Sequence, residues 1–412
     1  MTGTGAGVVI IGAGHAGGTA AAVLRQYGFS GPITLVGEEP IAPYQRPPLS
    51  KAWLKGEADA DTLALKPESF YAEHDIDLRL STRATALHRS AKEVALETGE
   101  RIPYETLIIA TGATPRRLHI PGADLAGVQV LRTAADAEVL KLALGPGKRL
   151  AVIGGGYIGL EAAASARALG AEAVVIEALQ RILVRPAGEV LATFFTDYHR
   201  AHGVDFELNA KIERFEGANG HVTGVRLADD RVIRCDVVVV GIGIKRNEEL
   251  ARDAGLECAN GVVVDEQART SDPAIFAIGD VTHRPMPLYG RMFWLESVSN
   301  ALEQAKQAAA AIAGRPAPPH EVTWNWSDQY DLKLQLAGIA LDSDDLLVRG
   351  DPAAAKFAVF HLRGQPPVIR AVEAVNAPAE FMAGRQLIGQ QKPIDRTKLA
   401  DPMVSMKEVA AG

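Results

Sequence analysis

Two short glycine-rich segments of the chain have the residue types and spacing that bind phosphates. Both follow the pattern G-x-G-x-x-G, in which missing side chains let the backbone approach a pyrophosphate. A β-branched run precedes each segment and an Ala-rich, helix-like stretch follows it, so unpaired N–H groups at a helix N-terminus would face the ligand. The positions concerned are Gly12, Gly14, Ala16 and Gly17 in the first segment, and Gly154, Gly156, Ile158 and Gly159 in the second.

An acidic residue follows each turn, Glu38 after the first and Glu177 after the second. A carboxylate about 20 residues beyond the turn hydrogen-bonds a ribose hydroxyl, so each segment predicts a dinucleotide site. Two such sites indicate a flavin enzyme with one FAD and one nicotinamide dinucleotide; the alternative is one working site beside a decayed duplicate. Glu177 favours NADH because it would repel the 2′-phosphate of NADPH, although Arg181 nearby could attract that phosphate or simply lie in a solvated loop.

The elements that must position these residues are two βαβ units, each followed by a closing strand. We expect helices over 18–26 and 160–169, later strands at 33–38, 106–113, 173–177, 236–243 and 275–280, and a helix over 300–313. A Pro-rich segment at 314–320 then marks a boundary. Beyond it, alternating segments at 332–339, 345–349, 356–362 and 368–375 predict antiparallel strands of a small α+β domain.

Composition excludes several other classes of protein. The 43 Lys and Arg against 50 Asp and Glu give a net charge of −7, which argues against a nucleic-acid partner. The two cysteines, Cys235 and Cys258, provide neither a disulfide framework nor a Cys-rich metal site, and they suit a reducing cytoplasm. The longest strongly apolar run is 237–244, far short of the ~18 residues that cross a bilayer. With no signal-peptide pattern at the start, we expect no membrane contact and a cytoplasmic location.

Two histidines, His199 and His202, are spaced to share one helix face. No acidic or cysteine ligands accompany them, so a surface pair is favoured over a metal site, and we expect no metal.

Five longer strings carry a family resemblance that extends from Val8 nearly to the C-terminus. The chain resembles the FAD-dependent pyridine nucleotide-disulfide oxidoreductases of glutathione-reductase-like architecture. Within them it is most similar to the putidaredoxin reductase-like NADH:ferredoxin reductases of bacterial oxygenase systems. The strings are RPPLSK at 46–51, GGGYIGLE at 154–161, TSDPAIFAIGD at 270–280, ESVSNALEQA at 296–305 and WSDQY at 326–330.

The resemblance implies an α/β fold with two Rossmann-like dinucleotide-binding domains and a small α+β C-terminal domain. The FAD-binding domain would comprise 1–113 and 245–318, with the NAD-binding domain at 114–244 between them. The C-terminal domain would cover 319–412.

The resemblance also implies roles for particular residues. Lys51 would lie near the flavin N5 and pair with Glu161 as the catalytic residues, whereas spacing alone makes Glu161 only a polar residue early in a helix. Asp280 would bind the FAD ribityl chain, its alternative role being an N-cap. The positions Arg132 and Val298 match residues that line FAD, and Gly243 belongs to the nicotinamide-side closing strand. Trp326 matches an aromatic near the flavin edge and the partner surface, or else a buried anchor of its domain.

The implied reaction carries hydride from NADH to FAD and then single electrons to a [2Fe-2S] ferredoxin serving a monooxygenase. Alternatives are a rubredoxin reductase, the reductase component of an aromatic-ring dioxygenase, or a signalling flavoprotein of the apoptosis-inducing factor type. Branches that use a redox-active cysteine are excluded, because the N-terminal region contains none. Lys306, Lys333 and Trp326 are candidate partner-binding residues, and a monomer or weak homodimer is expected.

One position departs from the family pattern. The second closing strand continues as GIGIKRN over 241–247, with Arg246 where proline is usual. We expect this change to loosen a turn beside the nicotinamide pocket and to affect NADH binding or cofactor preference.

Overall fold

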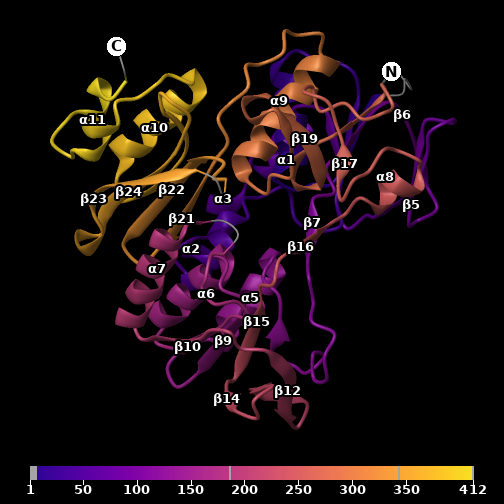
Figure 1. Ribbon diagram of the computed structural model, residues 1–412. Helices are drawn as coiled ribbons and strands as arrows, with labels where there is room; N and C mark the ends of the chain where they lie inside the picture. The colour runs from indigo at the N-terminus through magenta and orange to yellow at the C-terminus, as the bar shows by residue number, and fades with distance from the viewer. Residues whose placement is uncertain (1–6, 185–186, 342–343, 411–412) are drawn as a thin grey trace. The chain divides into compact units, whose positions relative to one another are not determined.

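The computed structural model describes residues 7–184, 187–341 and 344–410. The chain folds into two compact units, each built from separated stretches of sequence (Figure 1). Unit 1 comprises Met1–Arg46, Asp59–Thr114 and Ile244–Glu321, and unit 2 comprises Pro47–Ala58, Pro115–Gly243 and Val322–Gly412. Residues 47–58 thus belong to unit 2 although they interrupt the predicted FAD-binding stretch, and the division into three domains stays a prediction.

Unit 1 contains a mainly parallel sheet in the order β3-β2-β1-β6, with β18 beside β6 and an antiparallel extension through β5 and β4. All residues of the central strand β1 (Gly7–Ile11) are buried, as the run of Val and Ile residues in this strand predicts. The strands are β1 (Gly7–Ile11), β2 (Ile33–Val36), β3 (Ile76–Arg79), β4 (Ala84–His88), β5 (Glu93–Leu96), β6 (Arg101–Ile109) and β18 (Ile275–Ala277).

Further elements complete unit 1. A small sheet has the order β17-β19-β20, and β7 pairs with β16. These strands are β7 (Ala113–Pro115), β16 (Ile244–Arg246), β17 (Val262–Val263), β19 (Thr282–Met286) and β20 (Arg291–Phe293). The helices are α1 (His15–Gln26), α3 (Ala60–Leu63), α4 (Glu68–Glu73), α8 (Glu249–Asp253) and α9 (Val298–Ile312). The alanine faces of α1 and α9 pack together in one core with β1, which joins the glycine turn to a segment late in the sequence.

Unit 2 contains a parallel sheet in the order β11-β10-β9-β15-β8 and a three-stranded sheet, β12-β13-β14. The strands are β8 (Val128–Gln129), β9 (Arg149–Ile153), β10 (Glu172–Ile176), β11 (Val204–Glu207), β12 (Ile212–Ala218), β13 (His221–Leu227), β14 (Val232–Arg234) and β15 (Val237–Val240). The helices of this part are α2 (Ala52–Lys55), α5 (Ala134–Ala143), α6 (Tyr157–Ala168) and α7 (Glu189–Ala201).

The last part of unit 2 is a five-stranded antiparallel sheet in the order β21-β22-β25-β24-β23. Val372 and Phe360 on one face pack against Gly384 of α10, whereas Phe357 and Ser327 on the other contact α7 and α6. The elements are β21 (Trp324–Gln329), β22 (Leu332–Gly338), β23 (Asp345–Asp351), β24 (Lys356–Arg363), β25 (Val368–Val375), α10 (Pro378–Gln390) and α11 (Arg396–Ala400).

Several boundaries differ from the sequence predictions. Helices α1 and α6 each begin one residue after the middle glycine of their turns, three residues earlier than expected. The predicted starts were late because glycine has low helix propensity, whereas here the turn itself forms the N-cap. Strand β21 was not predicted, since its alternation is between polar residues and tryptophan. No helix in the described part of the chain is long and apolar enough to cross a membrane.

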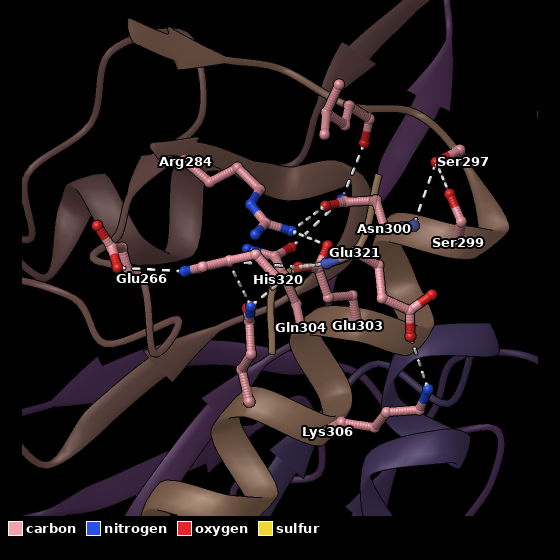
Figure 2. Close-up of polar contacts among 12 residues, drawn as sticks. Glu266, Arg284, Ser297, Ser299, Asn300, Glu303, Gln304, Lys306, His320 and Glu321 are labelled. Carbon is pink, nitrogen blue, oxygen red and sulfur yellow. Dashed lines mark hydrogen bonds and ion pairs between the residues drawn. The ribbon is translucent and has the colours of Figure 1, made fainter. Parts of the chain in front are cut away.

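A buried ion pair fixes α9 in unit 1 (Figure 2). The Arg284 guanidinium on β19 is 1% exposed and lies 2.9 Å from both Glu303 Oε2 and Asn300 Oδ1. One residue further along α9, Gln304 Oε1 accepts hydrogen bonds from the Gly279 N–H at 2.9 Å and the Thr282 hydroxyl at 3.0 Å. The helix is therefore tied to the segment that carries Asp280.

Removal of Arg284 should destabilise the protein strongly. Arg284→Met leaves Glu303 buried without its cation, so we expect unfolding to require about 3–5 kcal/mol less free energy in chemical denaturation. Arg284→Met combined with Glu303→Leu should recover most of this loss, because no unpaired charge then remains. Arg291→Met, at an exposed arginine, serves as the control, and a single Arg284 variant as stable as that control would contradict the prediction.

Candidate functional site

The first glycine turn joins β1 to α1. A Cβ atom at Gly12 would lie 2.2 Å from the Ala110 carbonyl oxygen, and one at Gly17 would lie 1.9 Å from the Gly12 carbonyl oxygen. At Gly14 nothing lies within 4 Å of such an atom. Two glycines are thus required by close backbone packing, while the third borders open space at the helix N-terminus.

Polar groups of unit 1 surround this turn. The His15 Nδ1 atom is buried and has no hydrogen-bond partner in the described part of the chain. Burial lowers the pKa of His15, and the nearby Asp280 carboxylate opposes that shift only in part, so the imidazole is neutral at neutral pH. The Glu38 side chain is 66% exposed and pairs with Arg83 at 3.2 Å.

These features fit the dinucleotide half of FAD. The N–H groups at the start of helix α1 could bind a pyrophosphate, and His15 Nδ1 is available for a ligand atom. Glu38 stands where a ribose is bound in this type of fold. Ala16 is buried in the first turn of α1, close to Gly279.

The second glycine turn, in unit 2, repeats the same geometry. A Cβ atom at Gly154 would lie 2.5 Å from the Gly241 carbonyl oxygen, and one at Gly159 would lie 2.6 Å from that of Gly154, yet Gly156 faces open space. Ile158, the residue before the last glycine, is 47% exposed at the start of α6.

The acid that follows β10 is held rigidly. Glu177 accepts the Gly155 N–H at 2.7 Å and the Leu179 N–H at 2.9 Å, which ties it to the glycine turn. Arg181 donates from one nitrogen to the carbonyls of Ile182, Leu183 and Ala187, at 3.3, 3.2 and 3.1 Å. The Arg181 guanidinium group is therefore hydrogen-bonded to carbonyl groups of its own loop. Contact of Glu177 with a ribose stays a prediction.

A buried ion pair occupies another part of unit 2. Lys51 Nζ lies 2.7 Å from Glu161 Oε2 and 3.0 Å from the Pro47 carbonyl oxygen. Glu161 is 4% exposed, and it also accepts hydrogen bonds from Ser50 at 2.5 Å and Ser327 at 2.6 Å. The buried carboxylate thus has three hydrogen-bond donors. The pairing expected from the resemblance is present, while the catalytic role of Lys51 and Glu161 stays a prediction.

The other predicted cofactor residues have local partners. The Arg132 N–H donates to Asp136 at 3.0 Å before α5, and Val298 is the half-buried first residue of α9. Gly243 has a φ of +106° and accepts the Arg116 N–H at 2.9 Å. Contact of these residues with a dinucleotide stays a prediction.

The predicted partner-binding residues differ in their surroundings. Lys306 Nζ lies 3.2 Å from Glu321 Oε1, so its charge is already paired (Figure 2). The Lys333 side chain on β22 is exposed. Trp326 is half-buried beside Trp324, with ring centroids 5.4 Å apart.

The prediction of a surface histidine pair is wrong for His199, which is fully buried, while His202 is exposed. Helix α7 turns His199 toward β21, where its Nε2 atom lies 2.7 Å from Gln329 Oε1. Burial lowers the pKa of His199 to about 4. Across the described ranges, no three His, Cys, Asp or Glu side chains are grouped so that they could hold a metal ion.

The expectation of a loosened turn at Arg246 is also wrong. Arg246 lies in β16, its side chain is only 10% exposed, and it pairs with Glu296 at 2.6 Å. Its guanidinium also lies over the Trp294 ring, 5.6 Å from the centroid. The ion pair and the ring anchor the segment without proline.

Sequence reasoning did not single out Ser50 or Ser327 as site residues. Both lie inside the strings that carry the family resemblance, next to Lys51 and Trp326. Position within those strings was the signal available, but a serine hydroxyl has no sequence pattern that identifies its partner.

The pyridine nucleotide-disulphide oxidoreductase family model matches residues 6–305, and the reductase C-terminal model matches 324–410. The chain belongs to the pyridine nucleotide-disulphide oxidoreductase family. It is 52% identical over 404 residues to a probable ferredoxin reductase of Castellaniella defragrans, with 98% of each chain covered. It is 41% identical over 371 residues to a rubredoxin-NAD(+) reductase of Pseudomonas putida, covering 90% of this chain and 96% of the relative.

A solved structure of a covalent putidaredoxin reductase–putidaredoxin complex matches with a TM-score of 0.96 at 38% identity, covering 98% of both chains. The predicted α/β fold class and family resemblance are confirmed. The chain is an oxidoreductase with FAD and NAD(H) as its cofactors.

Gly14 and Gly156, the middle glycines of the two turns, border open space and can be substituted as a matched pair. Gly14→Val should fold, since its Cβ meets no protein atom and its φ of −82° suits any residue. We expect the added bulk to weaken FAD binding at least about tenfold, measured as flavin retained after dialysis. Gly156→Val should leave flavin content unchanged and raise the KM for NADH. Loss of FAD from the Gly156 variant alone would reverse the assignment of the two turns.

Proposed function

We propose that this protein is an NADH:ferredoxin reductase that supplies electrons to a [2Fe-2S] ferredoxin serving a monooxygenase. The observation that carries the proposal is the similarity over the whole length, including the C-terminal part, to reductases of iron–sulfur partners. The solved relative was captured with putidaredoxin attached to it.

FAD, when bound, accepts a hydride from NADH and releases electrons one at a time. The chain's residues supply binding and charge for that chemistry. The first turn and Glu38 hold FAD, and the second turn with Glu177 holds NADH. Lys51 supplies a positive charge that favours an electron-rich flavin, and Glu161 fixes the position of that charge.

Preference for NADH over NADPH is supported by the surroundings of Glu177. Its carboxylate is fixed by two backbone N–H groups at the end of β10. Arg181, the nearby cation, is engaged by three carbonyls of its own loop. A 2′-phosphate would therefore meet a fixed negative charge without a free cation from Arg181.

Electrons must leave from the flavin itself, because the chain lacks the cysteine pair of disulfide reductases. Cys235 lies in unit 2 and Cys258 in unit 1, separated by 22 intervening residues. Burial raises the pKa of Cys235 to about 12 and that of Cys258 to about 11, so both thiols stay protonated and unreactive. A cytoplasmic location and a monomeric or weakly dimeric state stay predictions.

A panel assay tests the function. The purified holoenzyme is supplied with NADH or NADPH and with several [2Fe-2S] ferredoxins and a rubredoxin, and cytochrome c reduction is followed. We expect turnover with NADH and at least one ferredoxin, at rates above those with rubredoxin. Failure with every ferredoxin, together with rapid reduction of rubredoxin, would assign the protein to the rubredoxin branch instead.

Charge reversal tests the docking residues. Lys333→Glu should lower turnover with an acidic ferredoxin at least about threefold at low salt, an effect that shrinks as salt screens the charges. Lys306→Glu should act in the same direction, and it also breaks the pair with Glu321. Reduction of ferricyanide by NADH should be unaffected in both variants. An equal fall with both acceptors would show that these lysines act on the flavin and not on docking.

A further inference from the structure

The two oxygens of the buried Glu161 carboxylate are held by different parts of unit 2. Oε2 accepts from Ser50 and Lys51, which come directly before α2. Oε1 accepts from Ser327 of β21, at 2.6 Å. Ser327 therefore orients the carboxylate from the side opposite Lys51.

From Ser327 a series of hydrogen bonds runs through Gln329 to His199 of α7 and ends at Tyr330. Gln329 Nε2 donates to Ser327 Oγ at 2.9 Å, and Gln329 Oε1 lies 2.7 Å from His199 Nε2. His199 Nδ1 lies 3.2 Å from the Tyr330 hydroxyl. Ser327, Gln329 and His199 are at most 1% exposed, so water does not compete for these bonds.

The donor and acceptor groups of these side chains fix the direction of every hydrogen bond in the series from Glu161 to Tyr330. A carboxylate only accepts, so Ser327 must donate to Glu161, and its oxygen accepts from the Gln329 amide. The Gln329 carbonyl then requires a proton on His199 Nε2, which leaves Nδ1 as the acceptor for the Tyr330 hydroxyl.

The two ionisable members are consistent with this pattern. Burial lowers the pKa of His199 to about 4, so the imidazole is neutral with one N–H. Burial also raises the pKa of Tyr330, which therefore keeps its proton. Each hydrogen bond in the series from Tyr330 to Glu161 thus has one donor and one acceptor.

We propose that Ser327 is a positioning residue for the Lys51–Glu161 pair, and that Gln329 and His199 fix the direction of its hydroxyl. This inference rests on the proposed function. The chain orients the carboxylate and does not conduct protons, because the Gln329 amide does not exchange its protons along the path. It follows that residues of β21 support the Lys51–Glu161 pair.

Stopped-flow reduction of the FAD-loaded enzyme by NADH tests the proposal. Ser327→Ala leaves Glu161 Oε1 buried without its donor, and we expect flavin reduction to slow about tenfold with unchanged FAD content and NADH dissociation constant. Ser327→Thr, which keeps a hydroxyl, should restore the rate. Thr196→Val is the control, since Thr196 is also buried, at 8% exposure, but its hydroxyl donates to the Ala192 carbonyl of its own helix and, among the described residues, has no bond to Glu161.

A double-variant comparison separates positioning from a general structural effect. If Ser327 acts through the ion pair, Ser327→Ala should add no further loss to Lys51→Met. An unchanged rate in Ser327→Ala, or an equal loss in the Lys51→Met background, would overturn the proposal. Should Ser327→Ala not fold, Gln329→Met replaces it: slower reduction supports the chain, and an unchanged rate overturns it. A wild-type enzyme that NADH does not reduce would overturn the proposed function itself, and this inference with it.

Discussion

A buried carboxylate must receive hydrogen bonds or a counter-charge. Other parts of unit 2 must therefore supply donors and a cation to Glu161. Its donors come from two separated stretches, since Ser50 and Lys51 belong to 47–58 and Ser327 to β21, while Glu161 itself lies in α6. Loss of any one donor would leave a buried charge poorly compensated. This constraint explains why a short segment from the N-terminal third of the chain belongs to unit 2.

A different constraint shapes the two nucleotide turns. In each, the first and last glycines are demanded by contacts within the turn and with a neighbouring strand end, and only the middle one borders open space. The duplicated geometry also sets where α1 and α6 begin, so the helix N-termini, the turns and the following acids are positioned by the same local structure. Function at these sites depends on backbone approach more than on side-chain chemistry.

The sequence was sufficient for the parts of the protein whose signals are local. Both βαβ units, the glycine turns, the acids after them and most C-terminal strands follow from periodicity and spacing within short windows. The partners of Glu161 and the buried pair of Arg284 with Glu303 could not be predicted this way, because they depend on which distant segments meet. His199 shows the same limit, since its burial in α7 depends on a hydrogen-bond partner, Gln329 of β21, that lies 130 residues further along the sequence. Arg246 shows that an unusual residue can be accommodated by partners, Glu296 and Trp294, that lie far along the sequence.

The discontinuous composition of both units has a consequence for biosynthesis. Strand β18, helix α9 and Asp280 join the first glycine turn only after 244–321 has been translated, so the site proposed for FAD is incomplete before that point. Glu161 similarly lacks the Ser327 donor until the stretch that begins at Val322 has been translated. Neither unit can be completed before its later stretches have been translated, and until then the apolar strands β1 and β2 lack part of their core and are prone to aggregate.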